Sequence, residues 1–134
     1  MSSRNQLGSG FEEELCETLS QCGFWAHRLN ANKSGQPFDI IAAKDGQTYP
    51  LECKHCSKDK FETWRIEENQ YSAMYLWQFT GNGESWFALM LSDGDIFLVP
   101  YSATQFAPFN KKVWSEDDIR TQAIPIDRWV TQCG

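Results

Sequence analysis

The stretch PFDIIAAKDGQTYPLECK, residues 37–54, joins two short apolar runs through an Asp-Gly turn. Apolar runs of this length across Asp-Gly predict a β-hairpin, with strands at about FDIIAA and YPLECK. Three charged residues occupy positions in these runs where they would not stabilise a strand that serves only the hydrophobic core. Asp39 stands at the start of the first run, and Glu52 and Lys54 lie inside the second. The hairpin therefore predicts a functional cluster as well as part of the fold.

Alternation along the second strand indicates how these charges meet. Glu52 and Lys54 are expected on one face of the strand, and Cys53 and His55 on the other. Asp39, on the neighbouring strand, can face the same side as Glu52. Two carboxylates suit Mg²⁺ or Mn²⁺, which prefer oxygen ligands and keep several waters. An adjacent Lys can orient or deprotonate such a water and offset charge on a phosphate.

Helices and strands are predicted on both sides of the hairpin. Apolar residues at three- and four-residue steps predict an amphipathic helix from Gly10 to Cys22, ended by Gly23. FWAHRL predicts a strand, residues 65–79 a second helix, and SWFALML and DIFLVP two more strands joined at SDGD. The order αβββαββ predicts an α/β (α+β) domain with a central mixed β-sheet flanked by helices. After Pro100 the pattern weakens, and we expect a helix to start at WSEDDI and an extended piece at AIPIDRW.

Length and composition predict one domain with a real core. The chain has 134 residues, 41% of them hydrophobic, with six Trp and nine Phe. We expect a single domain over 1–134, with a flexible N-terminus at 1–9 and a peripheral C-terminal segment at 107–134. No apolar run approaches the roughly 20 residues of a membrane span, and MSSRNQLGSG lacks the pattern of a signal peptide. Five scattered cysteines fit reduced thiols and a cytoplasmic protein.

The net charge of −6 argues at first sight against a polyanionic partner. Its distribution weakens that objection, because residues 25–65 hold seven of the 12 basic residues and five of the 18 acidic ones. The alternative interpretation of such a mildly basic segment is an ordinary solvated face.

Several motifs together resemble a known nuclease group. PFD at 37–39, followed by ECK at 52–54, resembles the PD-(D/E)xK nuclease superfamily, with Phe38 between the Pro and the Asp. GSGFEEEL is similar to the segment of archaeal Holliday junction resolvases that supplies an additional metal-site Glu, a place held here by Glu12. EENQYSAMYLW resembles their second helix, where a Gln lies near the site, as Gln70 does here. WFALMLSDGDIFLVPYSATQF is more similar to the RecU-type resolvases.

The resemblance, which covers about residues 8–106, implies a restriction-endonuclease-like core and a metal-dependent endodeoxyribonuclease. The implied substrate is branched DNA, as for a Holliday junction resolvase, and the implied assembly is a homodimer. The implied catalytic residues are Glu12, Asp39, Glu52, Lys54 and Gln70. The implied ligands of one or two Mg²⁺ (or Mn²⁺) are Glu12, Asp39, Glu52 and the backbone carbonyl of Cys53. Lys54 and Gln70 would position the attacking water, and cleavage would leave a 5′-phosphate.

Glu12 borders the apolar stripe of the first helix and can face the sheet, whereas Glu13 and Glu14 are expected to face water. The loop HCSKDKFETWR leaves the site directly after Lys54, so the basic residues in it are expected to line a DNA groove, with the acidic excess on the far side. The predicted DNA-binding residues are Arg28, Lys33, His55, Lys58, Lys60 and Arg65.

Other interpretations stay open at this point. A nuclease for linear or damaged DNA would share every catalytic residue, and a non-catalytic DNA-binding or inhibitory protein would need no metal. The charges could also form only a salt-bridged edge strand. CKHC has the spacing of half a zinc site but no second pair. An aromatic set could stack on bases, but its density favours a core or a subunit interface: Trp64, Tyr71, Tyr75, Trp77, Phe79 and Trp86.

Overall fold

The structure, a computed structural model, describes residues 4–29, 38–105 and 112–133, with side chains from Gly10 onward in the first segment. Two 3₁₀ turns, η1 (Thr63–Arg65) and η2 (Tyr101–Thr104), accompany the regular elements. In chain order, the helices and strands are α1 (Arg4–Gln21), β1 (Trp25–Arg28), β2 (Ile40–Lys44), β3 (Gln47–Cys56), β4 (Phe61–Glu62), α2 (Glu68–Phe79), β5 (Trp86–Leu91), β6 (Ile96–Pro100), β7 (Val113–Trp114), α3 (Glu116–Gln122), β8 (Ile124–Pro125) and α4 (Ile126–Cys133).

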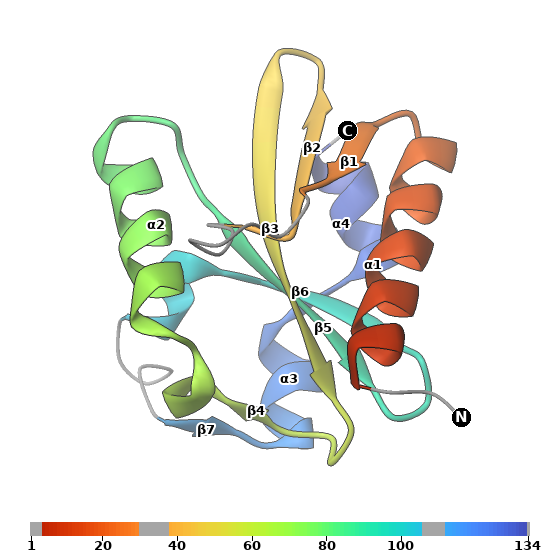
Figure 1. The fold of residues 1–134 in the computed structure, drawn as a ribbon, viewed down its shortest axis with the longest axis vertical. Helices are drawn as coiled ribbons and strands as arrows, with labels where there is room; N and C mark the ends of the chain where they lie inside the picture. The colour runs from red at the N-terminus through yellow and green to blue at the C-terminus, as the bar shows by residue number, and fades with distance from the viewer. Residues whose placement is uncertain (1–3, 30–37, 106–111, 134) are drawn as a thin grey trace.

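A mixed six-stranded sheet forms the centre of the molecule (Figure 1). Its strand order is β1-β2-β3-β5-β6-β8, in which β3 and β5 run parallel and the other neighbours antiparallel. Strands β4 and β7 form a separate two-stranded sheet. The predicted mixed sheet flanked by helices is confirmed, as is the order αβββαββ, to which the structure adds short elements after β3 and after β6.

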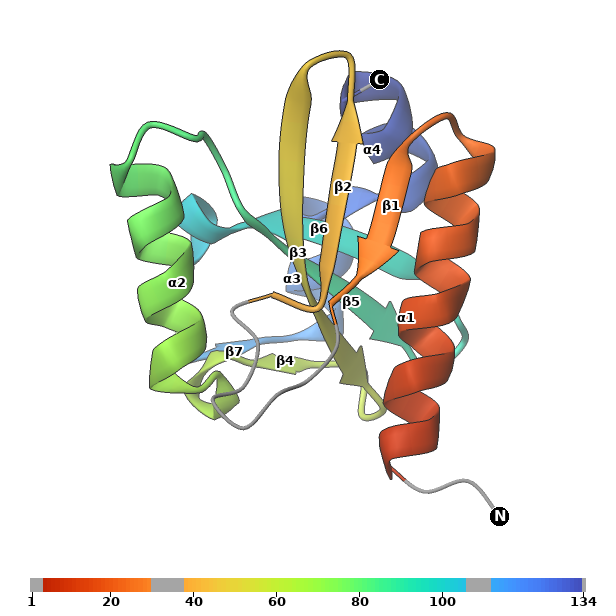
Figure 2. The same ribbon diagram turned by 45° about the horizontal axis from the view of Figure 1, so that its top comes forward.

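Two hydrophobic cores lie on the two faces of the sheet. On one face α1 and α4 cover residues such as Leu51 and Ala88, and on the other α2 and α3 cover residues such as Phe87 and Leu89. Neighbouring residues of β5 thus belong to opposite cores, as the alternation of side chains along a strand requires. Figure 2 shows β1, β2 and β3 side by side between α1 and α2.

The β2–β3 hairpin forms as predicted. Lys44 pairs with Gln47 across a two-residue turn, in which Asp45 and Gly46 both have positive φ, 51° and 81°. Such φ values are required by the turns that match the twist of two antiparallel strands, and Asp-Gly adopts them readily. The turn sets the register that places Ile40 opposite Leu51.

The C-terminal segment differs from expectation. The extended interpretation of AIPIDRW is confirmed only for Ile124–Pro125, which pair with β6 as β8, and it is wrong from Ile126 onward, where α4 begins. Apolar residues at Ile126, Trp129, Val130 and Cys133 follow a helical spacing and pack against the core beneath α1. Trp129 is fully buried, with its ring centroid 5.6 Å from that of Phe24. This part of the chain is built into the core rather than peripheral to it.

Helix boundaries also shift. α1 begins at Arg4, six residues before the predicted start, because glycines at positions 8 and 10 weaken the local helical signal. α2 begins at Glu68, after the 3₁₀ turn η1, instead of at residue 65. No helix in the described part of the chain is long and apolar enough to cross a membrane.

Candidate active site

Asp39 and Glu52 meet at the start of β2. The backbone N–H of Asp39 donates to the carbonyl of Leu51 (3.0 Å), so the β2–β3 pairing continues one residue beyond the strand. At the next hydrogen-bonding position of β3, the Asp39 carboxylate replaces a backbone acceptor: its Oδ2 accepts the N–H of Cys53 (2.8 Å). This carboxylate therefore caps the edge of β3 that β2 leaves open, and it lies beside Glu52 on the adjoining strand.

Glu52 is a buried acid with an unusual environment. Its side chain is 3% exposed, Oε1 accepts from Gln70 Nε2 (2.8 Å), and Lys54 Nζ lies 3.8 Å away. Oε2 is buried, and when Glu52 is ionised none of the described residues donates a hydrogen bond to it. Burial raises the pKa of Glu52 to about 9, helped by the charge of Asp39 and a hydrogen bond shared with its carboxyl, and opposed by Lys54. A buried carboxylate oxygen without a donor is suited to a cation.

Gln70 connects the helix α2 to this strand. Its Oε1 accepts the backbone N–H of Glu67 (3.2 Å), as the third helical residue of a capping box does, and it also accepts Lys54 Nζ (3.1 Å). Its Nε2 donates to Glu52. The start of α2 thereby holds the acid and the base of β3 in a fixed arrangement, and four predicted catalytic residues, Asp39, Glu52, Lys54 and Gln70, come together.

Glu12 lies at the margin of this group. Its side chain is 19% exposed and contacts Arg28, with Nε 3.8 Å from Oε1, while Arg28 Nη1 donates to Glu13 (3.1 Å). Burial and the nearby charge of Asp39 raise the pKa of Glu12, and Arg28 lowers it. Over the described ranges, no three His, Cys, Asp or Glu side chains converge closely enough to hold a metal ion. Glu12 therefore faces the site, as predicted, but its carboxylate is paired with Arg28.

Cys53 contributes through its backbone. Its N–H points toward Asp39, and because the N–H and C=O of one residue point to the same edge of a strand, its carbonyl points to that edge too. Its thiol packs in the core on the α1 face, where burial raises its pKa well above the usual value, whereas Cys56 packs in the core on the α2 face. The two thiols of CKHC thus lie on opposite faces, which removes the half-zinc-site interpretation.

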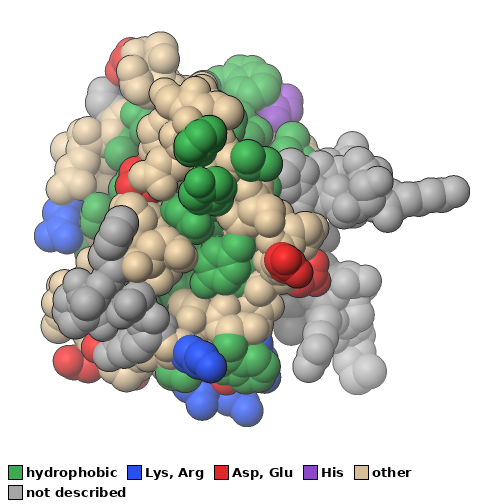
Figure 3. Space-filling view, turned by 90° about the vertical axis from the view of Figure 1, so that its left-hand side faces the viewer, with side chains coloured by type: hydrophobic (Ala, Val, Ile, Leu, Met, Phe, Trp, Pro, Cys, Tyr) green, Lys and Arg blue, Asp and Glu red, His purple; other side chains and the backbone are tan. Residues whose placement is uncertain are grey.

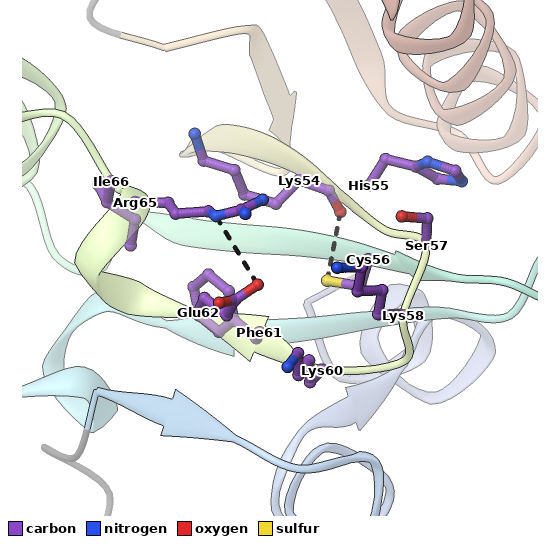
Figure 4. Close-up of a pocket in the computed structure, with 10 residues that line it drawn as sticks. All are labelled: Lys54, His55, Cys56, Ser57, Lys58, Lys60, Phe61, Glu62, Arg65 and Ile66. Carbon is purple, nitrogen blue, oxygen red and sulfur yellow. Dashed lines mark hydrogen bonds and ion pairs between the residues drawn. The ribbon is translucent and has the colours of Figure 1, made fainter.

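A basic hollow of about 200 Å³ begins at Lys54, beside the other predicted catalytic residues (Figure 4). Lys54 and His55 reach it from β3, Lys58 and Lys60 from the following loop, and Arg65 from η1. The predicted DNA-binding residues that follow the ECK motif therefore gather at one place. Of the remaining two, Arg28 lies on β1, ion-paired as described, and Lys33 lies outside the described residues.

One residue of this loop was missed from the sequence. Asp59 adopts a positive φ of 57°, and its carboxylate accepts the N–H and the hydroxyl of Ser92 (2.8 and 2.9 Å) in the β5–β6 turn. It thereby fixes the loop that carries Lys58 and Lys60. The available signal was the residue type, because Asp tolerates the left-handed region better than most residues.

The acidic excess is not confined to the far side. Asp93, Asp95 and Glu116 all bind Arg120 directly beside Ser92, the residue that holds the basic loop. The expectation that the acids lie away from the basic residues is therefore wrong for this group. The positive charge of Arg120 offsets one of the three negative charges of this acidic group.

The chain is similar to known proteins over nearly its whole length. The family model described as archaeal Holliday junction resolvase (Hjc) matches residues 3–128. The crossover junction endodeoxyribonuclease Hjc of Methanocaldococcus jannaschii is 28% identical over 127 residues, which cover 95% of this chain and 87% of that protein. The solved structure of Hjc from Archaeoglobus fulgidus, a Holliday junction resolvase from an archaeal hyperthermophile, has the same fold, with a TM-score of 0.71 at 19% identity over 92% of this chain and 99% of that one. Since the family model spans nearly the whole sequence, the chain belongs to the archaeal Holliday junction resolvase (Hjc) family.

Proposed function

We propose that this protein is a metal-dependent endodeoxyribonuclease that cleaves phosphodiester bonds in four-way DNA junctions. The observation that carries the proposal is the Asp39–Glu52 pair, with a buried oxygen to which, once Glu52 is ionised, no described residue donates a hydrogen bond. Its M. jannaschii relative is named a crossover junction endodeoxyribonuclease. All five cysteines are free thiols, in keeping with a cytoplasmic setting.

The residues that would hold the metal are Asp39, Glu52 and the backbone carbonyl of Cys53, with Glu12 as a further ligand if it leaves Arg28. This all-oxygen set fits Mg²⁺ or Mn²⁺, which proteins commonly bind through one or two carboxylates together with substrate phosphates. A bound ion of this kind would polarise the scissile phosphate and lower the pKa of its water.

Lys54 and Gln70 have separate roles in this proposal. The Lys54 ammonium stands beside the carboxylate pair and can orient the attacking water and offset charge that develops on the phosphate. Both polar atoms of Gln70 already contact protein groups, so we assign it the positioning of Lys54 and Glu52. The basic hollow next to Lys54 would hold DNA phosphates, which fixes the backbone without reading sequence.

Cleavage assays on a four-way junction, a fork, a duplex and a single strand test the proposal. Asp39→Asn should abolish cleavage and leave junction binding in Ca²⁺ intact, because one metal ligand is lost and a charge that repels phosphate is removed. Asp45→Asn, an exposed change in the turn of the same hairpin, is the matched control. Preferred cleavage of the duplex would favour a nuclease for linear DNA, and Mg²⁺-independent binding without cleavage of any substrate would favour a non-catalytic DNA-binding protein.

Salt dependence tests the DNA-binding residues of the hollow. In Lys58→Ala/Lys60→Ala, the slope of log affinity against log salt should fall by about 0.9 for each phosphate that the protein no longer neutralises. Arg128→Ala, an exposed change on α4, should leave the slope unchanged. An unchanged slope in the double variant would remove the basic hollow from the DNA interface.

We propose further that the protein works as a homodimer joined through α2. Tyr75, Leu76 and Phe79 are 54%, 56% and 73% exposed, and the two rings stack with centroids 5.7 Å apart. A hollow of about 400 Å³ beside them is lined in part by Tyr71 and Tyr101. Figure 3 shows hydrophobic side chains gathered on the α2 side of the molecule.

A large exposed apolar patch of this kind marks interaction surfaces, and a two-fold dimer would present two active sites to a junction with two strands to cut. Sedimentation of Leu76→Asp against the wild type tests this assignment. A variant that sediments as a monomer supports it, and an unchanged dimer would move the interface elsewhere.

A further inference from the structure

Two aromatic side chains on the edge strand β1 face solvent. Trp25 is 59% exposed, His27 is exposed as well, and their ring centroids lie 4.3 Å apart with the planes inclined by 35°. Neither ring belongs to the two hydrophobic cores formed by the described residues. The two adjacent rings therefore form an exposed aromatic surface of the kind on which nucleic-acid bases stack.

The pair lies on the catalytic face of the sheet. Ala26 packs toward α1, so alternation turns its neighbours Trp25 and His27 to the opposite face. His27 pairs with Ile41, which packs on the α2 side and is two residues from Asp39. The aromatic pair and the carboxylates therefore share one surface.

Position along the sheet adds a direction. Trp25 pairs with Ala43, which pairs with Thr48, four residues before Glu52 on β3, and the basic hollow begins two residues after Glu52, at Lys54. The aromatic pair, the carboxylates and the basic hollow thus follow one another in the strand direction, with the aromatic pair on β1, two strands across the sheet from β3. At about 3.3 Å per residue, Trp25 stands about 13 Å from Asp39, which corresponds to about four bases of a stacked DNA strand.

We propose that Trp25, supported by His27, is a stacking site for unpaired bases of the DNA strand that is cut. The inference rests on the nuclease function proposed above and adds an interaction that carries base rather than phosphate recognition. A strand whose phosphates lie in the basic hollow and whose scissile bond meets the carboxylates would continue toward β1. Bases freed from pairing near the branch then reach the indole, which is 59% exposed and has the small residue Ala43 as its cross-strand neighbour.

Fluorescence of 2-aminopurine, a base analogue quenched by stacking, tests the site. The probe is placed one to four nucleotides on each side of the cleavage point of a four-way junction, and Ca²⁺ replaces Mg²⁺ to prevent turnover. Trp25→Leu should abolish the quenching on one side of the cleavage point and weaken junction binding about tenfold, the effect of removing one base–aromatic stack. Trp25→Phe should restore both. Trp64→Leu, whose 58%-exposed indole packs on Arg65, compares an exposed indole beside the basic hollow, and Arg128→Ala on α4 is the control distant from both.

Each outcome separates this inference from the proposed function. Wild-type quenching and affinity in Trp25→Leu would overturn the stacking site and leave the nuclease assignment standing. Loss of quenching in Trp64→Leu but not in Trp25→Leu would place the base-stacking residue at η1 and would also overturn the stacking site at Trp25. A Trp25→Leu variant that changes its sedimentation without changing DNA binding would show that a second copy of the chain covers the indole. A wild-type protein that does not bind the junction overturns both proposals.

Discussion

Replacing Glu52 by Gln should stabilise the metal-free protein while removing its activity. Glu52 is buried beside Asp39, and its pKa is raised from the ordinary 4.5 to about 9. The neutral amide of Gln keeps an acceptor for Gln70 Nε2 and adds a donor that can face Asp39. The substitution therefore removes the cost of a buried acid and retains its main hydrogen bond.

The size of the effect follows from proton binding. Between pH 4.5 and pH 9 the folded state holds a proton on Glu52 that the unfolded state releases, so stability falls as the pH rises through this window. Each pH unit in this window is worth about 1.4 kcal/mol, so the cost carried by the wild type grows by about 2–3 kcal/mol from pH 5 to pH 7. Glu52→Gln lacks this cost, and its advantage over the wild type in unfolding free energy should grow by the same amount over these two pH units.

Urea unfolding in EDTA at pH 5, 7 and 8.5, followed by circular dichroism, measures the difference. Glu14→Gln, at an exposed position on α1, provides a control whose difference from the wild type should not change with pH. A gap between Glu52→Gln and the wild type that stays constant from pH 5 to pH 8.5 would refute the reasoning. It would mean that Glu52 is ionised in the metal-free fold.

Metal binding, the position of Glu12 and the packing of α4 lead to three more predictions. Calorimetry should show Mn²⁺ affinity rising with pH below about 9, with about one proton released per ion at pH 7, because the metal must displace the proton of Glu52; a pH-independent affinity would contradict this. Glu12→Gln should reduce single-turnover junction cleavage far more than Glu13→Gln, because Glu12 is half-buried near Asp39 and Glu13 is 69% exposed; equal losses would remove Glu12 from the site. Trp129→Ala should lower the unfolding free energy by about 3–5 kcal/mol in urea, the usual cost of deleting a buried Trp, and a loss below about 1 kcal/mol would show that α4 is dispensable to the core.

The amino-acid sequence alone was enough to predict the hairpin, the order of the main elements and the residues that meet at the start of β2. These features are local, because an Asp-Gly turn sets the register and a period of two residues decides which side chains share a face. Once Ile40 pairs with Leu51, Asp39 and Glu52 must lie together. The periodicity places Asp39 and Glu52 side by side, and the resemblance to the nuclease motif adds the expectation that they bind a metal.

Other features depend on segments that are distant in the chain. The pKa of Glu52 is raised first by burial, and part of what surrounds this side chain is Gln70 from the distant helix α2. Arg28 reaches Glu12 across 16 positions, and Asp59 finds Ser92 across 33, which sets the state of one candidate ligand and the shape of the basic loop. None of these interactions produces a periodic pattern in the sequence from which it could be predicted.

The C-terminal segment shows the same division. Ile126, Trp129, Val130 and Cys133 carry a helical spacing, but eight residues are too few for a helix to be stable without a surface to cover. That surface exists only after β6, α1 and the β2–β3 hairpin have assembled and left a place for Trp129 beside Phe24. Local interactions decide periodicity and turns, whereas burial, and with it the ionisation of Glu52 and the folding of α4, is decided by what the rest of the chain packs against each residue.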